Sequence, residues 1–543
     1  MPAGEIILVA YSHENLFLNS EPQITFFKIL YRRYSNFAIE TIRQNFNSTI
    51  KFGNKYSIEI SKLADLLHKM WVVIDLPEIP IVYDFDNNPD NKLKFKWARD
   101  IGYVAIDYLE LEIEGKTITR HWGEYYNCLN KLYWNNFNGT IDEYIGNVPE
   151  VINYKHVSKG IASYSLKIPL NFWFCGNSGD CLPLINSEFS SIKFNIKLND
   201  LNKCGIFSPS NYIDVQKYSG NGILGEPLLQ ISHQGYAWGE FDSIDINTFN
   251  KVTLDVNSYN LYYRKISDNN FMTSLGLEKL QLSDSISKLQ QFVIYGLYSG
   301  SIYIPNNASA DNVNSIYSSK KYFVNFDNNI LLKDMYVLLD FIYIDNDERI
   351  KFYNSKRKYL IDQVYQTSVH DISNQSSKIH IKTMNCCKYL LFMGQVKYFM
   401  NSNVNFNFNY NNIFFDAKLI NPALYFFDFI EQNTINHALT LYDSSKSEKD
   451  MKMDVYSLVS PFYDFKKATN ENGFGLKSFS LYPQNSQPSG SLNTSKFQSL
   501  EMQMYFNKID YNYNLYLYRC YVVTYNYLTF SNGVSGTIFT NAY

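Results

Sequence analysis

The chain has 543 residues, which is more than one typical hydrophobic core requires and predicts two or three domains. Its formal charge is -3, so there is no overall basic field to attract the phosphates of a nucleic acid, and a direct role in packaging a genome is not expected. Aromatic residues make up 17% of the chain and charged residues only 19%, an enrichment in Tyr and Phe that favours strands and predicts an all-β protein.

The N-terminal segment predicts a short helix followed by a first strand. Pro22 suits a first helical turn, and Ile24, Phe27 and Tyr31 then fall on one helical face. From Phe37 onward the spacing changes to period two, as a strand that enters a sheet requires. We therefore expect a helical foot that leads into a sheet.

The same segment carries a family resemblance. It has L-V-A-Y at 8–11, P-Q-I-T-F-F-K at 22–28, Y-R-R-Y at 31–34 and N-F-A at 36–38. In this order these motifs closely resemble the amino-terminal signature of the major capsid proteins of nucleocytoplasmic large DNA viruses. The name comes from the order of the residues and not from their composition or periodicity.

The next segments predict strands and a hairpin. Residues 56–60 alternate, and 70–76 form an apolar strand that Pro77 ends. Residues 84–91 indicate an exposed loop. Residues 108–120 predict a hairpin with a turn at Gly115-Lys116, in which Leu and Ile alternate with acidic residues. The acidic residues, Glu110, Glu112 and Glu114, are interpreted as the solvated face of the hairpin in preference to a metal site.

Residues 124–144 have helical spacing and predict a connecting helix. A second β block follows at 166–198, where an I-P-L strand, F-W-F, a glycine turn and L-P-L-I come in the order found in the capsid family. Cys175 and Cys181 flank that turn, and the absence of a secretory signal favours two thiols over a disulfide loop.

The resemblance is interrupted and then resumes. Residues 199–332 do not resemble the family and are interpreted as an insertion in the first β domain. The resemblance returns at 335–352, as a buried strand, an acidic turn and an Arg, and the strand at 359–363 resembles the start of a second roll. The turn before Lys388 and the segment 421–444 depart from the family pattern, whereas 478–490 and 525–541 match it again. The turn at 488–490 is expected to join the strands 476–482 and 500–506.

No catalytic, metal-binding or cofactor-binding residue is predicted, and no cofactor. The His residues show no metal-ligand spacing, and His121 is interpreted as a structural residue at a strand end. The acidic turn at 345–348 lacks the glycine and distal glutamate of a calcium loop. The candidate contact residues are Lys28, Arg32 and Arg33, for which we favour a protein partner over nucleic acid because three cations without a wider patch bind nucleic acid weakly. Asn-x-Ser/Thr triplets leave glycosylation open.

The resemblance implies a fold and a function. The fold is an all-β tandem double jelly roll, two eight-stranded antiparallel sandwiches, divided into an arm and helical foot at 1–35, a first roll at 36–355 with the insertion at about 199–332, and a second roll at 356–543. The implied function is a structural capsid protein whose homotrimers form pseudo-hexagonal capsomers of an icosahedral shell. Neighbouring capsomers and minor capsid proteins beneath the shell are the implied partners, and Lys28, Arg32 and Arg33 would face the interior.

Two alternatives stay open. The departures from the family pattern are compatible with a minor capsid paralogue at special lattice positions. A carbohydrate-binding jelly roll, with Tyr and Trp stacked on sugars, is a different class, and an enzyme is the weakest class. No apolar stretch is long enough to cross a membrane, so we expect a soluble protein made and assembled in the host cytoplasm and located in the virion.

Overall fold

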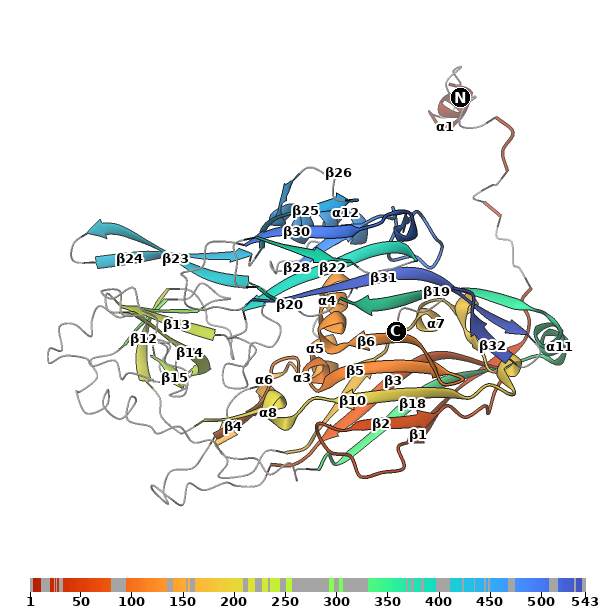
Figure 1. Ribbon diagram of the computed structural model, residues 1–543, viewed down its shortest axis with the longest axis horizontal. Helices are drawn as coiled ribbons and strands as arrows, with labels where there is room; N and C mark the ends of the chain where they lie inside the picture. The colour runs from red at the N-terminus through yellow and green to blue at the C-terminus, as the bar shows by residue number, and fades with distance from the viewer. Residues whose placement is uncertain are drawn as a thin grey trace.

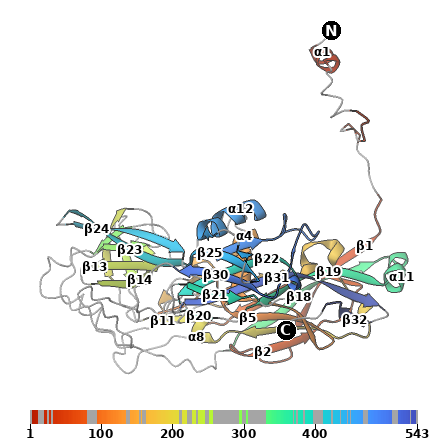
Figure 2. The same cartoon turned by 45° about the horizontal axis from the view of Figure 1, so that its top comes forward.

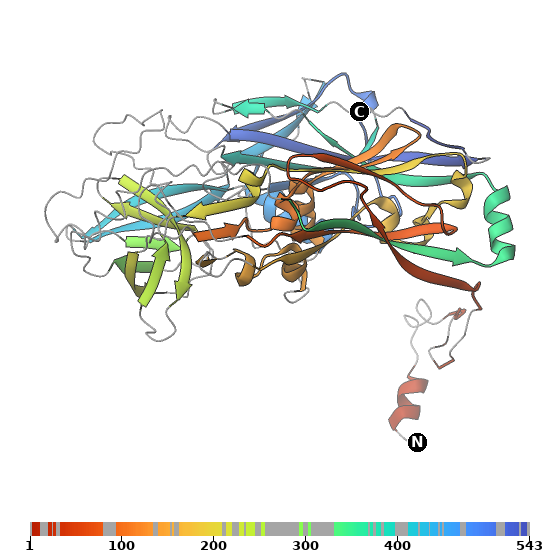
Figure 3. The ribbon, with the colours of Figure 1, turned by 90° about the horizontal axis from the view of Figure 1, so that it is seen from below.

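The computed structural model shows a β-sheet molecule from which an N-terminal arm projects (Figure 1, Figure 2, Figure 3). The structure describes residues 3–539 apart from 11–19, 24, 26, 29–32, 80–93, 134–139, 153–154, 157–161, 209–212, 220–226, 233–234, 245–250, 256–292, 297–301, 306–330, 368–369, 373–375, 382–384, 397–410, 422–423, 434, 444–445, 448–449, 467–473, 507–515 and 532–533.

Two antiparallel sheets form a first sandwich. The strand order of one sheet is β1-β18-β3-β8, with β9 paired to β3, and the order of the other is β2-β10-β5-β6. The bounds are β1 Phe37–Asn45, β2 Lys55–Glu59, β3 Leu66–Leu76, β5 Ile106–Ile113, β6 Lys116–Trp122, β8 Tyr164–Pro169, β9 Leu182–Pro183, β10 Ile192–Leu198 and β18 Asp334–Ile344. The expected strands near 56–60, 70–76 and 192–198 are thus present.

Alternation along the strands explains why these two sheets pack together. In β18 the side chains of Met335, Val337 and Leu339 are buried, and the residues between them are partly exposed. In β10, Ile192 and Phe194 are buried in the same hydrophobic cluster. Because successive side chains point to opposite faces of a strand, each sheet has an apolar inner face. Burial of each such side chain stabilises the fold by about 1.5–3 kcal/mol.

Two further antiparallel sheets form a second sandwich from the C-terminal part of the chain. One has the order β19-β31-β22-β28, with β20 and β32 paired to β31 and β29 paired to β22, and the other has the order β21-β30-β25-β26, with β27 paired to β25. The bounds are β19 Arg357–Gln366, β20 His370–Ile372, β21 Ser376–His380, β22 Cys386–Val396, β25 Ile435–Tyr442, β26 Lys446–Ser447, β27 Met451–Lys452, β28 Phe474–Ser478, β29 Leu492–Asn493, β30 Leu500–Phe506, β31 Tyr516–Ser531 and β32 Val534–Thr537. Two paired antiparallel sandwiches are the arrangement that a tandem double jelly roll requires.

Smaller sheets lie at one end of the molecule, on the left in Figure 1. They comprise a three-stranded sheet, a closed barrel with the order β12-β15-β14-β13-β16-β17, and the separate hairpin β23-β24. The bounds are β4 Lys94–Trp97, β7 Lys155–His156, β11 Gly205–Ser208, β12 Ile213–Ser219, β13 Pro227–Ser232, β14 Gly235–Ile244, β15 Lys251–Asp255, β16 Val293–Gly296, β17 Ile302–Pro305, β23 Asn411–Asn421 and β24 Leu424–Asn433. The strands β11 to β17 fall within the region 199–332 that the sequence suggested as an insertion.

The helices are short and lie mostly in connections. Their bounds are α1 Ala3–Val9, α3 Ile101–Val104, α4 Gly123–Tyr133, α5 Thr140–Ile145, α6 Pro149–Ile152, α7 Trp173–Gly176, α8 Leu201–Cys204, α11 Asn346–Asn354 and α12 Ser460–Phe465, with a π-helix η5 at Val455–Val459 and 3₁₀ turns η2 Ser178–Asp180, η3 Ile185–Ser187 and η6 Thr494–Lys496. Among the described residues, no helix has the length and apolar character needed to cross a membrane.

Three local predictions need correction. The N-terminal arm does contain a short helix, but it is α1 at Ala3–Val9, and the described residues between Ser20 and Asn36 are not helical. The region 124–144 holds two helices, α4 and α5, in place of one. The F-W-F motif lies after β8 and begins the helix α7, because Pro169 ends the strand.

The acidic segment after β18 was predicted as a turn and is instead the start of α11. The side chain of Asp345 caps this helix by accepting a hydrogen bond from the backbone N–H of Asn346 at 2.7 Å. Asp347 and Glu348 lie in the first turn, where negative charge stabilises the positive end of the helix dipole. The expected exposed loop at 84–91 lies outside the described residues.

Candidate functional site: the surfaces and the contact between the sandwiches

The residues predicted to contact partners lie on the N-terminal arm. Lys28 and Arg33 are exposed, and Arg32 lies outside the described residues. Phe27, next to Lys28, is 99% exposed, and Tyr34, next to Arg33, is also exposed. The arm therefore presents both cationic and aromatic side chains that the described part of the chain does not cover.

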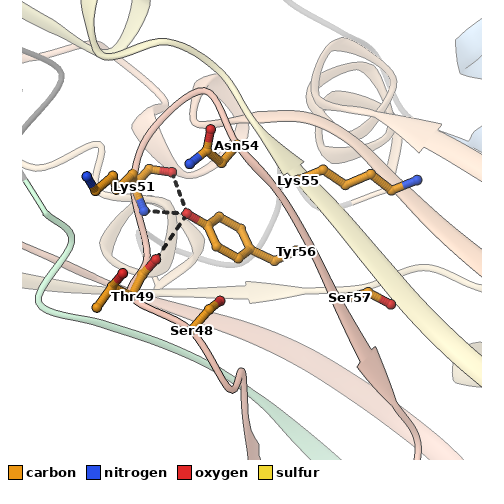
Figure 4. Close-up of a pocket in the computed structure, with 7 residues that line it drawn as sticks. All are labelled: Ser48, Thr49, Lys51, Asn54, Lys55, Tyr56 and Ser57. Atoms are coloured by element: carbon orange, nitrogen blue, oxygen red, sulfur yellow. Dashed lines mark hydrogen bonds between the residues drawn. The ribbon is translucent and has the colours of Figure 1, made fainter.

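A shallow polar hollow lies where the connection after β1 meets β2. It is lined by Ser48, Thr49, Lys51, Asn54, Lys55, Tyr56 and Ser57 (Figure 4). The hydroxyl of Tyr56 accepts a hydrogen bond from the backbone N–H of Lys51 at 2.5 Å and lies 3.1 Å from the Lys51 carbonyl oxygen, to which it can donate. These bonds hold the connection in its turn, so Tyr56 has a structural role in the hollow.

An ion-pair cluster crosses the outer face of the sheet that contains β5. The carboxylate of Glu110 accepts hydrogen bonds from Lys55 Nζ at 2.9 Å and from Arg120 Nε at 2.8 Å. The Arg120 guanidinium also lies 4.8 Å from the centre of the Tyr108 ring. Burial raises the pKa of the Glu110 carboxyl, but the bonds from Lys55 and Arg120 outweigh it and hold the pKa below its usual value. Glu110 is only 2% exposed, so the prediction that it belongs to a solvated face was wrong.

The turn of that hairpin is also displaced by one residue from its predicted position. Glu114 and Gly115 both have positive φ angles, 53° and 76°, which places the two-residue loop at 114–115. A loop with two positive φ angles matches the right-handed twist of the strands that it joins.

A second ion pair fixes α11 to the first sandwich. Arg349 donates from Nε and Nη2 to the two carboxylate oxygens of Asp65, both at 2.9 Å, and the backbone N–H of Ile344 donates to Asp65 Oδ2 at 3.0 Å. Asn186, in η3, donates to the carbonyl oxygen of Phe352 at 2.8 Å. The end of β18, the helix α11 and η3 are therefore held together.

Polar contacts join the two sandwiches. Gln363, in β19, donates from Nε2 to the carbonyl oxygen of Ile118 at 2.6 Å. Arg519 Nη1, in β31, lies 2.5 Å from Glu124 Oε1 of α4. Because these partners are separated by 245 and 395 positions in the chain, no local sequence signal indicates them.

An apolar cluster lies at the same contact. Its buried residues from α4 are Tyr125, Cys128, Leu129 and Leu132, and those from the second sandwich are Val364, Tyr389, Leu391, Met393, Phe465, Phe474, Leu476, Tyr521 and Val523. The hydroxyls of Tyr125 and Tyr389 form a hydrogen bond of 3.3 Å across it. The α4 helix therefore connects the two sandwiches, and Figure 1 shows it between them.

His121 is a buried structural residue near the end of β6, as the sequence predicted. Its ring stacks on Phe172 with centroids 4.9 Å apart, Nδ1 lies 3.1 Å from the Tyr126 hydroxyl, and Nε2 lies 3.3 Å from Thr119 Oγ1. Burial lowers the pKa of His121 to about 3, so the ring is neutral at physiological pH.

The described residues contain no group of three or more His, Cys, Asp or Glu that could hold a metal ion. Cys175 and Cys181 are free thiols, and burial raises their pKa values, that of Cys181 to about 11. Buried thiols of high pKa are poor nucleophiles.

Comparison with known proteins fits this picture. The family described as "Major capsid protein N-terminus" matches residues 25–223, and the family described as "Large eukaryotic DNA virus major capsid protein" matches residues 348–536. Probable capsid protein 4 of Acanthamoeba polyphaga mimivirus is 30% identical over 99% of each chain. Capsid protein 1 of the same virus is 34% identical over 38% of this chain and 36% of its own. Among solved structures, the Faustovirus major capsid protein has a TM-score of 0.61 at 10% identity, over 96% of this chain and 94% of its own.

The fold and the relatives show that this is a structural capsid protein of a giant virus, with the double jelly-roll fold, and not an enzyme. The chain belongs to the family of large eukaryotic DNA virus major capsid proteins. The resemblance in the sequence motifs is thereby confirmed, and the place of the protein is the capsid of the virion.

Proposed function

We propose that three copies of this chain form a pseudo-hexagonal capsomer that tiles an icosahedral shell. The observation that carries the proposal is the pair of jelly rolls connected through α4 in a chain whose full length matches a capsid protein. Two similar sandwiches in each copy give a trimer six similar units, which is the number that a hexagonal outline needs. Assembly is the mechanism, and each specific contact between copies should bury more than about 1,000 Å².

We also propose the division of the chain given by the sequence: an arm at 1–35, a first roll at 36–355 with the insertion at about 199–332, and a second roll at 356–543. The strand pairing supports it, because β1 to β18 and β19 to β32 supply separate pairs of main sheets. The first family match ends at residue 223 and the second begins at residue 348, eight residues before the proposed start of the second roll, which supports a boundary in this region.

The arm also bears on which end of the capsomer faces the interior of the shell. We propose that Lys28, Arg32 and Arg33 face the shell interior and contact minor capsid proteins, and that the insertion decorates the outside. The exposure of Lys28 and Arg33 supports the first part, and the position of the barrel β12–β17 at the opposite end from α11 supports the second (Figure 1). As suggested by the sequence, we also propose that assembly takes place in the host cytoplasm.

A second role within the same family has its own support. The full-length relative is named Probable capsid protein 4, and the same virus has a Capsid protein 1 that matches this chain over a shorter span. A virus with several such chains can place one of them at special lattice positions. A minor capsid paralogue is therefore the second candidate function.

The mass of the purified protein in solution tests the proposal. Light scattering near neutral pH should give a stable species at about three times 63.4 kDa over a range of protein concentrations. A strict monomer at every concentration would contradict the self-assembling capsomer and favour the paralogue that needs its virion neighbours.

A further inference from the structure

The N-terminal helix α1 is apolar and has no covering surface in the described part of the chain. Its sequence is AGEIILV, and the side chains of Ile6, Leu8 and Val9 are 56%, 81% and 70% exposed. All three views show α1 apart from the sheets of the body (Figure 1, Figure 2, Figure 3). A helix that is apolar on several sides requires burial against a partner.

The arm joins the body beside α11. Phe37, the first residue of β1, pairs with Ile344, and α11 begins two residues later at Asn346. The free arm and the helix α11 are therefore at the same end of the molecule. We call it the basal end.

The basal end has exposed apolar residues of its own. Ile350 and Tyr353, on α11, are 60% and 54% exposed, and Phe189, which follows η3, is 75% exposed. The hydrogen bond from Asn186 to the carbonyl oxygen of Phe352 holds η3 against α11. Phe189, Ile350 and Tyr353 form what we call the basal patch.

We propose that α1 of one copy binds to the basal patch of a neighbouring copy in the same capsomer, so that the copies exchange arms. The proposal rests on the trimer put forward above, in which three-fold symmetry would place the three basal ends at the same level along the axis. The chain between Val9 and Phe37 can span up to about 90 Å when extended, which is enough to reach a neighbour. A second copy is the occupant that fits best, because α1 stands away from its own body and both surfaces are apolar.

Cysteine crosslinking between two differently marked chains tests the exchange. One chain carries Ile6→Cys and the other carries Ile350→Cys, and the two are mixed before assembly and treated with a short bis-maleimide. We expect a crosslink between the two chains in the trimer fraction. Adding Leu8→Asp to the Ile6→Cys chain should lower the yield of the crosslinked product about tenfold, because a charged side chain opposes burial of the helix.

The matched control replaces Ile350→Cys with Phe462→Cys, on α12. Phe462 is 54% exposed, so the introduced thiol is comparably accessible, and Figure 1 shows its helix α12 apart from α11 at the basal end. This pair should give only the background crosslinking of the wild-type cysteines. Equal crosslink yields from the Ile350→Cys and Phe462→Cys chains would overturn the proposal. A third chain carries both Ile6→Cys and Ile350→Cys, and a crosslink that forms only within this single chain would also overturn it.

The mass of the wild-type protein separates this proposal from the proposed function. A trimer with the expected crosslink supports both. A trimer without the crosslink contradicts the arm exchange alone, whereas a wild-type protein that stays monomeric contradicts the capsomer itself.

Discussion

At the scale of single residues, His121 shows how burial converts an ionisable side chain into a structural one. The ring is 3% exposed and packs on Phe172, while its nitrogens lie near the hydroxyls of Thr119 and Tyr126. A charged imidazolium there would lose most of its hydration. Burial therefore lowers the pKa from 6.5 to about 3.

This shift predicts an acid-dependent loss of stability. The pKa of His121 is lower in the folded than in the unfolded protein. Its contribution to the free energy of unfolding is therefore complete above about pH 6.5 and declines as the pH falls toward 3. His121→Gln should remove this part of the loss, so that urea midpoints measured at fixed protein concentration decline less steeply between pH 6.5 and 4 than those of the wild type. Parallel declines of the two proteins would contradict the assignment.

Glu110 is the second residue whose environment differs from its local pattern. Alternation with Leu109 and Leu111 correctly predicts a strand, and it also predicts that Glu110 faces water. The face is polar, but Lys55 and Arg120 from the two flanking parts of the sheet cover the carboxylate. Strand alternation identifies the face of a sheet, whereas the neighbours on that face determine how much water reaches it.

At the scale of elements, α4 is the helix on which the contact between the rolls depends. Leu132 is fully buried in the cluster that α4 shares with the second sandwich. Leu132→Ala should lower the free energy of unfolding by about 2–5 kcal/mol, from lost burial and the cavity that remains. Calorimetry or urea unfolding measures this loss.

Leu63→Ala is the matched control for that substitution. It removes the same atoms from a leucine that is 57% exposed, so the change in the free energy of unfolding should stay within about 0.5 kcal/mol. Similar effects of the two substitutions would show that α4 does not carry the contact.

At the scale of the whole molecule, the balance of charge bears on how copies associate. The formal charge is only -3, and the exposed side chains of the basal end and of α12 include large apolar residues. Association driven by apolar burial should resist salt, since ions screen charges and do not weaken burial. The mass of the capsomer should therefore be the same in about 0.1 M and about 1 M NaCl, where the Debye length is roughly 10 Å and 3 Å. Dissociation at the higher salt would indicate that ion pairs hold the copies together.

Part of this protein could be predicted from its sequence because the signals are local. Period-two alternation identified β2, β3, β10 and the hairpin β5–β6, and the order of short motifs identified the capsid family. The same reasoning missed the helix α11, although Asp345 and the acidic first turn are a helix start signal, because the acidic residues were interpreted as a turn.

The rest depends on residues that are distant in sequence and adjacent in space. The buried state of Glu110 requires Lys55 from another strand, the position of α11 requires Asp65, and the contact between the rolls requires Arg519 beside Glu124. The strands could be inferred from the sequence because backbone alternation acts between neighbours along the chain, and the family could be inferred from the order of short motifs. Which charges are buried, and how the two rolls join, could not be inferred before the fold was known, because burial and ion pairing depend on which segments meet in space.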